Sequence, residues 1–212
     1  MSLTGTERGG IIARFRPYRD PGAEMPLAAL HDLYVGELRD LHSAEDQLVK
    51  ALPRMAEGAA APELRASFER HAQVTEQQAE RLGLILGGLG VKATGTKCKA
   101  MAGLIAEARD VLESATHPAV LDLALIGAAL RIEHYEIVGY ECVRTYAKRL
   151  GFKDATALLT QTLEEEEEAE ERLSLLAQSV ILFEAEAAKP GEVSTKKARS
   201  RRAKKKPPRK DG

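Results

Sequence analysis

Polar side chains that interrupt the apolar faces of amphipathic helices are the residues of this sequence that could do chemistry. At about 100° per residue, Glu45 falls near the centre of an apolar stripe that includes Leu41 and Leu48. His71 falls in the middle of the stripe on the next helical segment. The complete set of candidate metal ligands is Glu45, His71, Glu133, Glu136, Glu166 and Glu170.

The second half of the chain repeats this pattern with carboxylates alone. Glu136 is central on its inner face, and Glu133 lies one turn earlier, about 60° away. Glu166 is surrounded by Leu and Ala positions, and Glu170 follows one turn later, about 40° away. Within the acidic run 164–168, only Glu166 has an inward azimuth. The run as a whole therefore predicts a solvated acidic face.

Five carboxylates and one imidazole need positive charge if they share a dry helix-bundle interior, because an unpaired buried charge loses its hydration. No Lys or Arg lies at the centre of an inner stripe, and Arg144 lies only at the edge of one. We therefore expect bound cations, and an oxygen-rich site with one nitrogen ligand suits iron or manganese. A single Glu or His in such a position is more often an ordinary core residue. The joint pattern from four helices is what favours a metal site.

Helical periodicity divides the chain into four long segments and one short segment, most of them bounded by Gly or Pro. Two long segments precede a crossover and two follow it, which is typical of ferritin-like four-helix bundles. The absence of Trp and the 4% aromatic content also favour an all-α fold. The long helices are expected at about 26–57, 62–86, 118–150 and 154–188, and the short helix at 100–113, within the crossover 91–118.

The formal charge of −1 conceals two oppositely charged parts. Residues 189–212 contain eleven Lys or Arg and two acidic residues, a formal charge of +9, which leaves about −10 for residues 1–188. We expect residues 1–25 to form a flexible arm, 26–188 the helical domain and 189–212 a disordered basic tail. The tail could bind nucleic-acid phosphates without sequence preference, or it could only keep the protein soluble.

Several function classes are not indicated by this sequence. Cys98 and Cys142 do not make a disulfide framework. The N-terminus has no apolar core of a secretory signal, and no apolar run of 18 residues exists. We therefore expect a cytoplasmic protein with no membrane partner. A nucleophile–base constellation, a Gly-rich phosphate loop and a CxxC pair are also lacking, which argues against hydrolases and nucleotide-binding proteins.

Five stretches of the chain resemble the YciE/YciF family of ferritin-like stress proteins. They are LHDLYVGELRDLHSAEDQLVKALPRM at 30–55, ASFERHAQVTEQQAERL at 66–82, KCKAMAGLIAEA at 97–108, RIEHYEIVGYE at 131–141 and LLTQTLEEEEEAEERL at 158–173. The EHYEI and CKAMAGLI segments are the most specific. The resemblance covers about 28–180. It implies a ferritin-like bundle related to rubrerythrin-type di-iron proteins, a homodimer and a part in stress tolerance.

The resemblance also implies a ligand pattern, from which this sequence departs. Ferritin-like di-iron proteins place a Glu on one helix and Glu-x-x-His on the next, in both halves. Glu45 matches the first Glu, but Phe68 stands where the Glu before His71 would be. The last long helix offers Glu166 and Glu170 without a histidine.

If the pattern is filled by two irons, or by manganese, Glu136 would bridge the ions and His71 would be the nitrogen ligand. The family usually has a Glu three residues after this His, where the chain has Val74. Such a centre could oxidise Fe(II) or consume peroxide, which would make the protein a ferroxidase-like or peroxidase-like oxidoreductase. Two alternatives stay open. One is a non-enzymatic stress or interaction module in which the same groups share protons, and the other is a DNA-associated protein that uses its basic tail.

Overall fold

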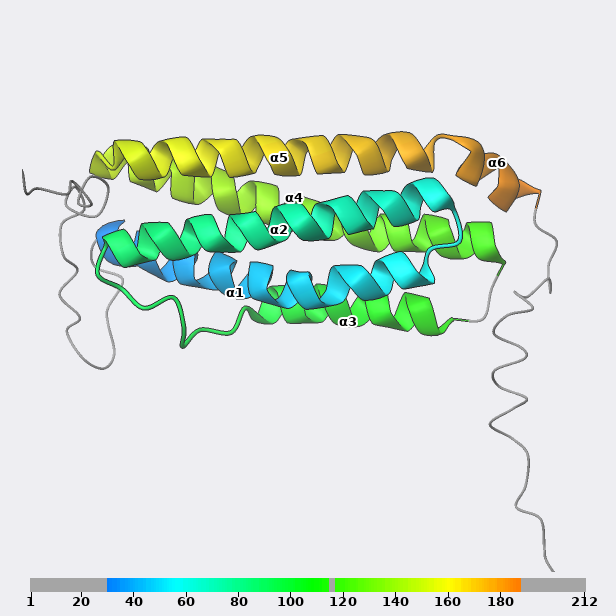
Figure 1. Ribbon diagram of the computed structural model, residues 1–212, viewed down its shortest axis with the longest axis horizontal. Helices are drawn as coiled ribbons and strands as arrows, with labels where there is room; N and C mark the ends of the chain where they lie inside the picture. The colour runs from blue at the N-terminus through cyan, green and yellow to red at the C-terminus, as the bar shows by residue number, and fades with distance from the viewer. Residues whose placement is uncertain (1–29, 115–116, 188–212) are drawn as a thin grey trace, which may run out of the picture.

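Two antiparallel helix hairpins lie side by side in the computed structural model, which describes residues 30–114 and 117–187 (Figure 1). The helices in these ranges are α1 (Leu30–Gly58), α2 (Pro62–Gly88), α3 (Lys99–Glu113), α4 (Pro118–Leu150), α5 (Lys153–Ala177) and α6 (Val180–Glu186). The crossover between the hairpins carries α3, which packs against α1 and α4. The predicted all-α four-helix bundle, with a short helix in its crossover, is confirmed.

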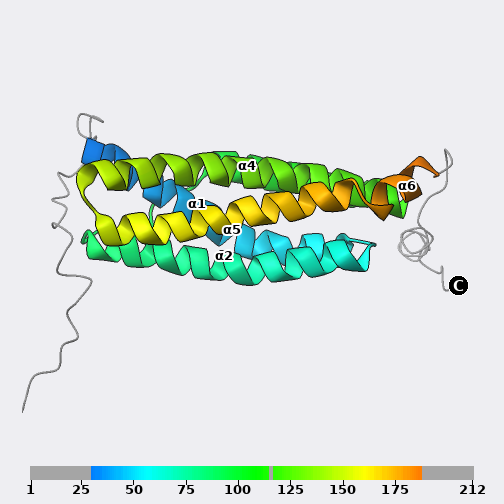
Figure 2. The same cartoon turned by 90° about the horizontal axis from the view of Figure 1, so that it is seen from above.

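The four long helices surround a single interior. Within the hairpins α1 contacts α2 and α4 contacts α5, and between the hairpins α1 contacts α4 and α2 contacts α5. Figure 2 shows α5 running alongside both α4 and α2, with α1 behind them. Because each long helix touches two others, the inner stripes of all four converge.

A buried carboxylate ties the first hairpin turn to the second hairpin. Asp122 of α4 is 1% exposed, and its two oxygens accept hydrogen bonds from the backbone N–H groups of Ala60 and Ala61 at 2.8 and 2.7 Å. The N-terminus of α2 has no side-chain cap of its own, so Asp122 satisfies these amides and complements the positive end of the helix dipole. The second hairpin turns at Gly151, whose φ of 80° suits a residue without Cβ.

The last predicted helix, 154–188, is broken in the structure. It ends at Ala177, and the short helix α6 begins at Val180. Between them Ser179 adopts an extended backbone, and its hydroxyl donates to the carbonyl of Leu176 at 2.7 Å. A serine that bonds a nearby carbonyl competes with the helical ladder, and the break lets α6 pack back onto α4. The single uninterrupted helix was therefore a wrong prediction.

Some expectations fall outside the described part of the chain. These are the N-terminal arm, the helical start at 26–29 and the basic tail from residue 189 onward. Among the helices that the structure does describe, none is both long enough and apolar enough to cross a membrane.

The apolar core is divided into two clusters. The first includes Leu48, Leu52 and Phe68, and fills the end of the bundle near α3 and the turn between α1 and α2. The second includes Leu38 and Leu82, and fills the opposite end. We call them the α3-end cluster and the far-end cluster. On each long helix, at least one polar residue singled out from the sequence lies between the two clusters.

Candidate metal centre

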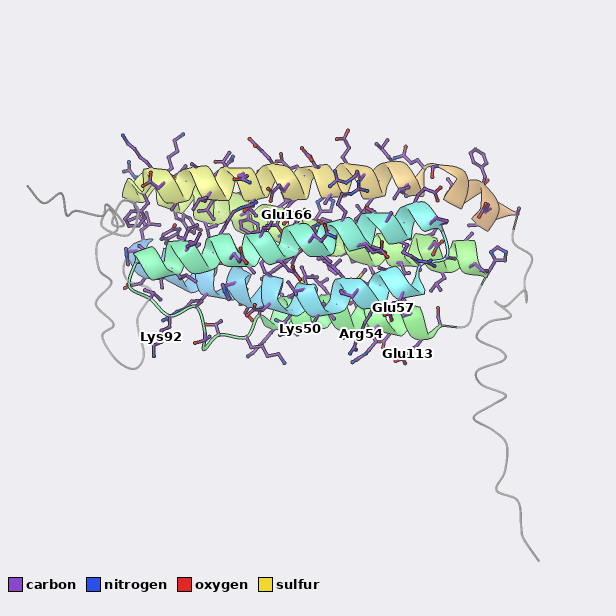
Figure 3. All side chains as sticks on the ribbon, viewed as in Figure 1. Lys50, Arg54, Glu57, Lys92, Glu113 and Glu166 are labelled. Atoms are coloured by element: carbon purple, nitrogen blue, oxygen red, sulfur yellow. The ribbon has the colours of Figure 1, made fainter. Side chains whose placement is uncertain are left out.

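Each long helix places at least one ionisable side chain in the layer between the two apolar clusters. On α1, Glu45 lies between Leu41 of the far-end cluster and Leu48 of the α3-end cluster. Glu166 lies in the corresponding part of α5, near the middle of the bundle, as labelled in Figure 3. Five of the six sequence candidates are buried, none more than 6% exposed: Glu45, His71, Glu133, Glu136 and Glu166.

Four of these residues form a compact group. His71, Glu133, Glu136 and Glu166 each offer a ligand atom, and these atoms all lie within 4.8 Å of one another. The His71 Nε2 atom is 3.3 Å from Glu133 Oε1 and 3.8 Å from Glu166 Oε2. One cation between them could therefore contact atoms from three helices, α2, α4 and α5.

The polar atoms of this group lack the hydrogen bonds that buried polar atoms normally have. Such atoms cost free energy unless a partner replaces the lost water. A metal ion is a partner that several carboxylate oxygens and one imidazole nitrogen can share. In the described part of the chain, the buried ligand-type atoms of this group without a hydrogen-bond partner are His71 Nε2, Glu133 Oε2, Glu136 Oε1, Glu136 Oε2, Glu166 Oε1 and Glu166 Oε2.

Glu45 lies beside this group and is oriented by a tyrosine. The hydroxyl of Tyr140, which is completely buried one turn after Glu136 on α4, donates a hydrogen bond to Glu45 Oε1. Burial raises the pKa values of Glu133 and Glu136 most, and the charge of Glu45 raises them further, so the carboxyl groups are close enough to interact. Glu45 could therefore supply a further ligand while Tyr140 holds it in place.

Glu170 differs from the other five candidates. It is half-buried, and its Oε1 accepts a hydrogen bond from Ser174 at 2.8 Å on the same helix. It does not belong to the group of four, because one turn along α5 moves its carboxylate away from the middle of the layer.

Burial sets the protonation of the layer. It raises the pKa of Glu133 to about 8 and the pKa values of Glu45, Glu136 and Glu166 well above their ordinary value, and neighbouring carboxylates add to each shift. Burial lowers the pKa of His71, although Glu166 partly opposes this. Without a cation, Glu133 therefore keeps its proton near neutral pH, and burial favours the protonated forms of the other carboxyls and the uncharged form of the imidazole. A bound cation would displace those protons.

An ion pair at the edge of the layer was missed by the sequence analysis. Arg81 of α2 is 9% exposed, and its guanidinium donates to both oxygens of Glu165 at 2.6 and 2.7 Å and to the hydroxyl of Thr162 at 3.0 Å. The spacing of three residues from the inward-facing Gln78 could have indicated Arg81. Glu165 could not be separated from the acidic run around it, because it faces α2 across the seam and not the centre of the bundle.

Comparison with known proteins identifies the family to which this chain is similar. Residues 29–186 match the family model described as "Domain of unknown function (DUF892)". The chain is 39% identical over 154 residues to Protein YciF of Escherichia coli, which covers 72% of the chain and 93% of that protein.

Solved structures agree with this match. The crystal structure of the E. coli stress protein YciF has a TM-score of 0.69 at 39% identity, covering 71% of this chain and 96% of that one. The protein YcfI of Rhodopseudomonas palustris has a TM-score of 0.69 at 36% identity, covering 72% and 97%. A protein of Xanthomonas campestris, with a TM-score of 0.60 at 20% identity over 75% and 99%, supports the fold alone.

Proposed function

The chain belongs to the DUF892 family of YciF-like stress proteins, and we propose that its buried layer is a di-metal centre in which iron is the preferred metal. The ligands would be His71, Glu133, Glu136 and Glu166, with Glu45 held by Tyr140 as the fifth. Glu170 would join only after it gives up its hydrogen bond to Ser174.

One observation carries the proposal. Six ligand-type atoms of four buried residues meet in one layer without hydrogen-bond partners among the described residues. The nearest buried guanidinium, that of Arg81, is already engaged by Glu165 in two hydrogen bonds. Among the described residues, Arg81 and Arg172 form their ion pairs with Glu165 and Glu168 and not with the carboxylates of the layer. A metal ion would supply the missing direct positive charge.

The charge of the layer favours two ions over one. Glu45, Glu133, Glu136 and Glu166 together carry −4 when they are ionised, and each is at most 1% exposed. One divalent ion would leave two negative charges in a dry interior, whereas two divalent ions neutralise all four. A ligand set of carboxylate oxygens and one imidazole nitrogen suits iron or manganese. Copper(I) and structural zinc more often have thiolate ligands, which this layer lacks among the described residues.

The protein's own part in the chemistry would be to hold the metal ions, to keep water away from them and to release protons from the ligand carboxyls. When bound, iron would supply exchange between Fe(II) and Fe(III), which suits oxidation of Fe(II) by dioxygen or by peroxide, with the electrons lost by Fe(II) reducing the oxidant. Tyr140 fixes one oxygen of Glu45. The two apolar clusters exclude water above and below the layer. The carboxyls with raised pKa values would release protons as cations bind.

Anaerobic titration with Fe(II) tests the proposal. We expect about two ions per chain and an accompanying release of protons. The double variant Glu45→Ala/Glu136→Ala should lose this binding. The matched control Glu167→Gln removes an exposed carboxylate from α5 and should bind iron as the unsubstituted chain does. Absence of binding by the unsubstituted protein would contradict the proposal.

A proton-sharing core is the second candidate, because the pKa of Glu133 is raised to about 8. Such a layer could remain neutral through protonation and serve only a non-enzymatic stress or interaction protein. The two candidates differ in their response to added iron. A metal centre raises the melting temperature as iron is added, whereas a proton-sharing core leaves it unchanged.

A further inference from the structure

Helices α2 and α5 pack against each other along a seam (Figure 2), and buried polar side chains occupy part of it. Gln78 of α2 is completely buried, and Arg81 follows it toward the surface. On α5, Thr162 is 1% exposed and bonds Arg81. Buried polar residues contribute less to stability than packed leucines would, so this lining calls for another explanation.

The Arg81–Glu165 pair closes this seam at the surface. The side chain of Arg81 is 11% exposed and that of Glu165 is 25% exposed, which makes the pair the point where the polar lining meets solvent. Gln161 and Gln78 both donate to Glu165, at 3.0 and 3.3 Å. The pair is thus held from both sides of the seam.

The pair is electrostatically connected to the centre. The charge of Arg81 favours the ionised form of Glu45, and the charge of Glu165 acts on Glu45, His71 and Glu166. Glu165 also directly precedes Glu166 in the chain. A cation that approached along this seam would therefore meet Glu165 and Arg81 before it met the ligands.

A buried polar atom suited to such a passage lies on a residue that contacts the pair. Gln78 donates through Nε2 to Glu165, but its Oε1 atom is buried and has no hydrogen-bond partner in the ranges described. A carbonyl-type oxygen is a ligand that hard cations and their water molecules accept. Gln78 could therefore contact a hydrated ion on its way to the centre.

We propose that the α2–α5 seam is the entrance through which divalent cations reach the carboxylate centre, with Glu165 attracting them and Arg81 limiting their passage. This inference rests on the proposed metal centre, whose ligands it leaves unchanged. Arg81 and Glu165 act on the rate of uptake, and the carboxylates of the layer set the final occupancy. Removing either member of the pair should therefore change the uptake rate, in opposite directions.

The entrance is tested by the rate at which the metal-free full-length protein takes up Co(II). Stopped-flow absorbance of the bound ion measures this rate. Arg81→Met should speed uptake and Glu165→Gln should slow it, each by about tenfold at low salt, which is the low end of electrostatic steering. The double variant Arg81→Met/Glu165→Gln restores neutrality and should return near the original rate. Both single effects should shrink at 0.5 M salt because added ions screen the forces on a cation that approaches the pair through solvent.

Control variants show whether a changed uptake rate results from the altered charge or from loosened helix packing. Arg70→Met on α2 and Glu167→Gln on α5 remove exposed charges from the same helices and should leave the rate unchanged. If both pair variants speed uptake, or neither changes it while Co(II) still binds, the entrance is overturned and the centre stands. If the unsubstituted protein binds no Co(II), the centre fails and the entrance fails with it. Arg81→Lys, which keeps the charge, should remain close to the original rate.

Discussion

The middle and the two ends of the bundle interior are buried to the same degree but contribute to stability in opposite ways. At the ends, apolar residues such as Leu48 and Leu86 are removed from water, which stabilises the fold. In the middle, carboxyls such as that of Glu136 lose hydration and gain no hydrogen bond from the described residues. Burial alone therefore does not indicate a stabilising residue. The apolar ends support a middle whose composition suits ligand binding.

The largest expected change in stability comes from a substitution at an apolar end of the bundle interior. Phe68→Ala removes a ring that is 1% exposed in the α3-end cluster, and should lower the free energy of unfolding by about 3–5 kcal/mol. Denaturant titration of the metal-free protein measures it. A loss below about 1 kcal/mol would show that this end of the bundle does not carry the fold.

An apolar substitution in the polar middle should change the stability of the metal-free protein in the opposite direction. Glu136→Leu replaces a carboxyl without partners by an apolar side chain of similar size, and should raise the free energy of unfolding of the metal-free protein by about 1–3 kcal/mol. The same variant should lose the stabilisation that iron gives. Glu141→Leu, at an exposed position of the same helix, is the control and should change stability by less than about 0.5 kcal/mol. A destabilised metal-free Glu136→Leu protein would contradict the comparison.

The pH dependence of the metal-free protein should also reveal the middle. The pKa of Glu133 is about 8 in the folded state, against an ordinary value of 4.5. The folded state therefore binds more protons between these values. This contribution to stability is complete below pH 4.5 and is lost as the pH rises through 8.

Melting curves of the chelator-treated protein check this sign. We expect the melting temperature to fall by roughly 3–8 °C between pH 5 and pH 8.5. With iron bound the trend should reverse over the same range, because cations compete with protons for the same oxygens. A melting temperature that rises with pH in the absence of metal would show that the carboxyls are ionised in the folded state.

The smallest effect should come from the support of one ligand. Tyr140→Phe keeps the ring in the far-end cluster but removes the hydrogen bond to Glu45. Metal affinity should fall about tenfold, as for other partners of metal ligands, while the melting temperature of the metal-free protein changes little. Competition with a chelator of known affinity measures this, and an unchanged affinity would show that Tyr140 does not position Glu45.

Periodicity alone predicted the inward direction of five of the six candidates, because long helices keep a regular 3.6-residue repeat. It placed Glu45, His71 and Glu136 between apolar neighbours, and the structure buries all three. It could not tell that Glu170 would lie half-buried and bonded to Ser174. An azimuth does not give the distance of a side chain from the bundle axis.

Contacts between helices were beyond the sequence. Asp122 caps a helix that begins sixty residues earlier in the chain, and Arg81 finds its partner 84 residues later in Glu165. Such pairings depend on which helices become neighbours and at what register. The break at Ser179 was missed because a serine that bonds its own helix's carbonyl is common inside helices as well as at their ends.

The central claim is that the carboxylates of the middle layer hold metal ions. Elemental analysis of the full-length protein, purified without chelator from cells grown with added iron, tests it most directly. We expect about two ions per chain, mainly iron with some manganese, and a loss of both in Glu45→Ala/Glu136→Ala. A correctly folded protein that carries no metal and takes up no Fe(II) would contradict the account.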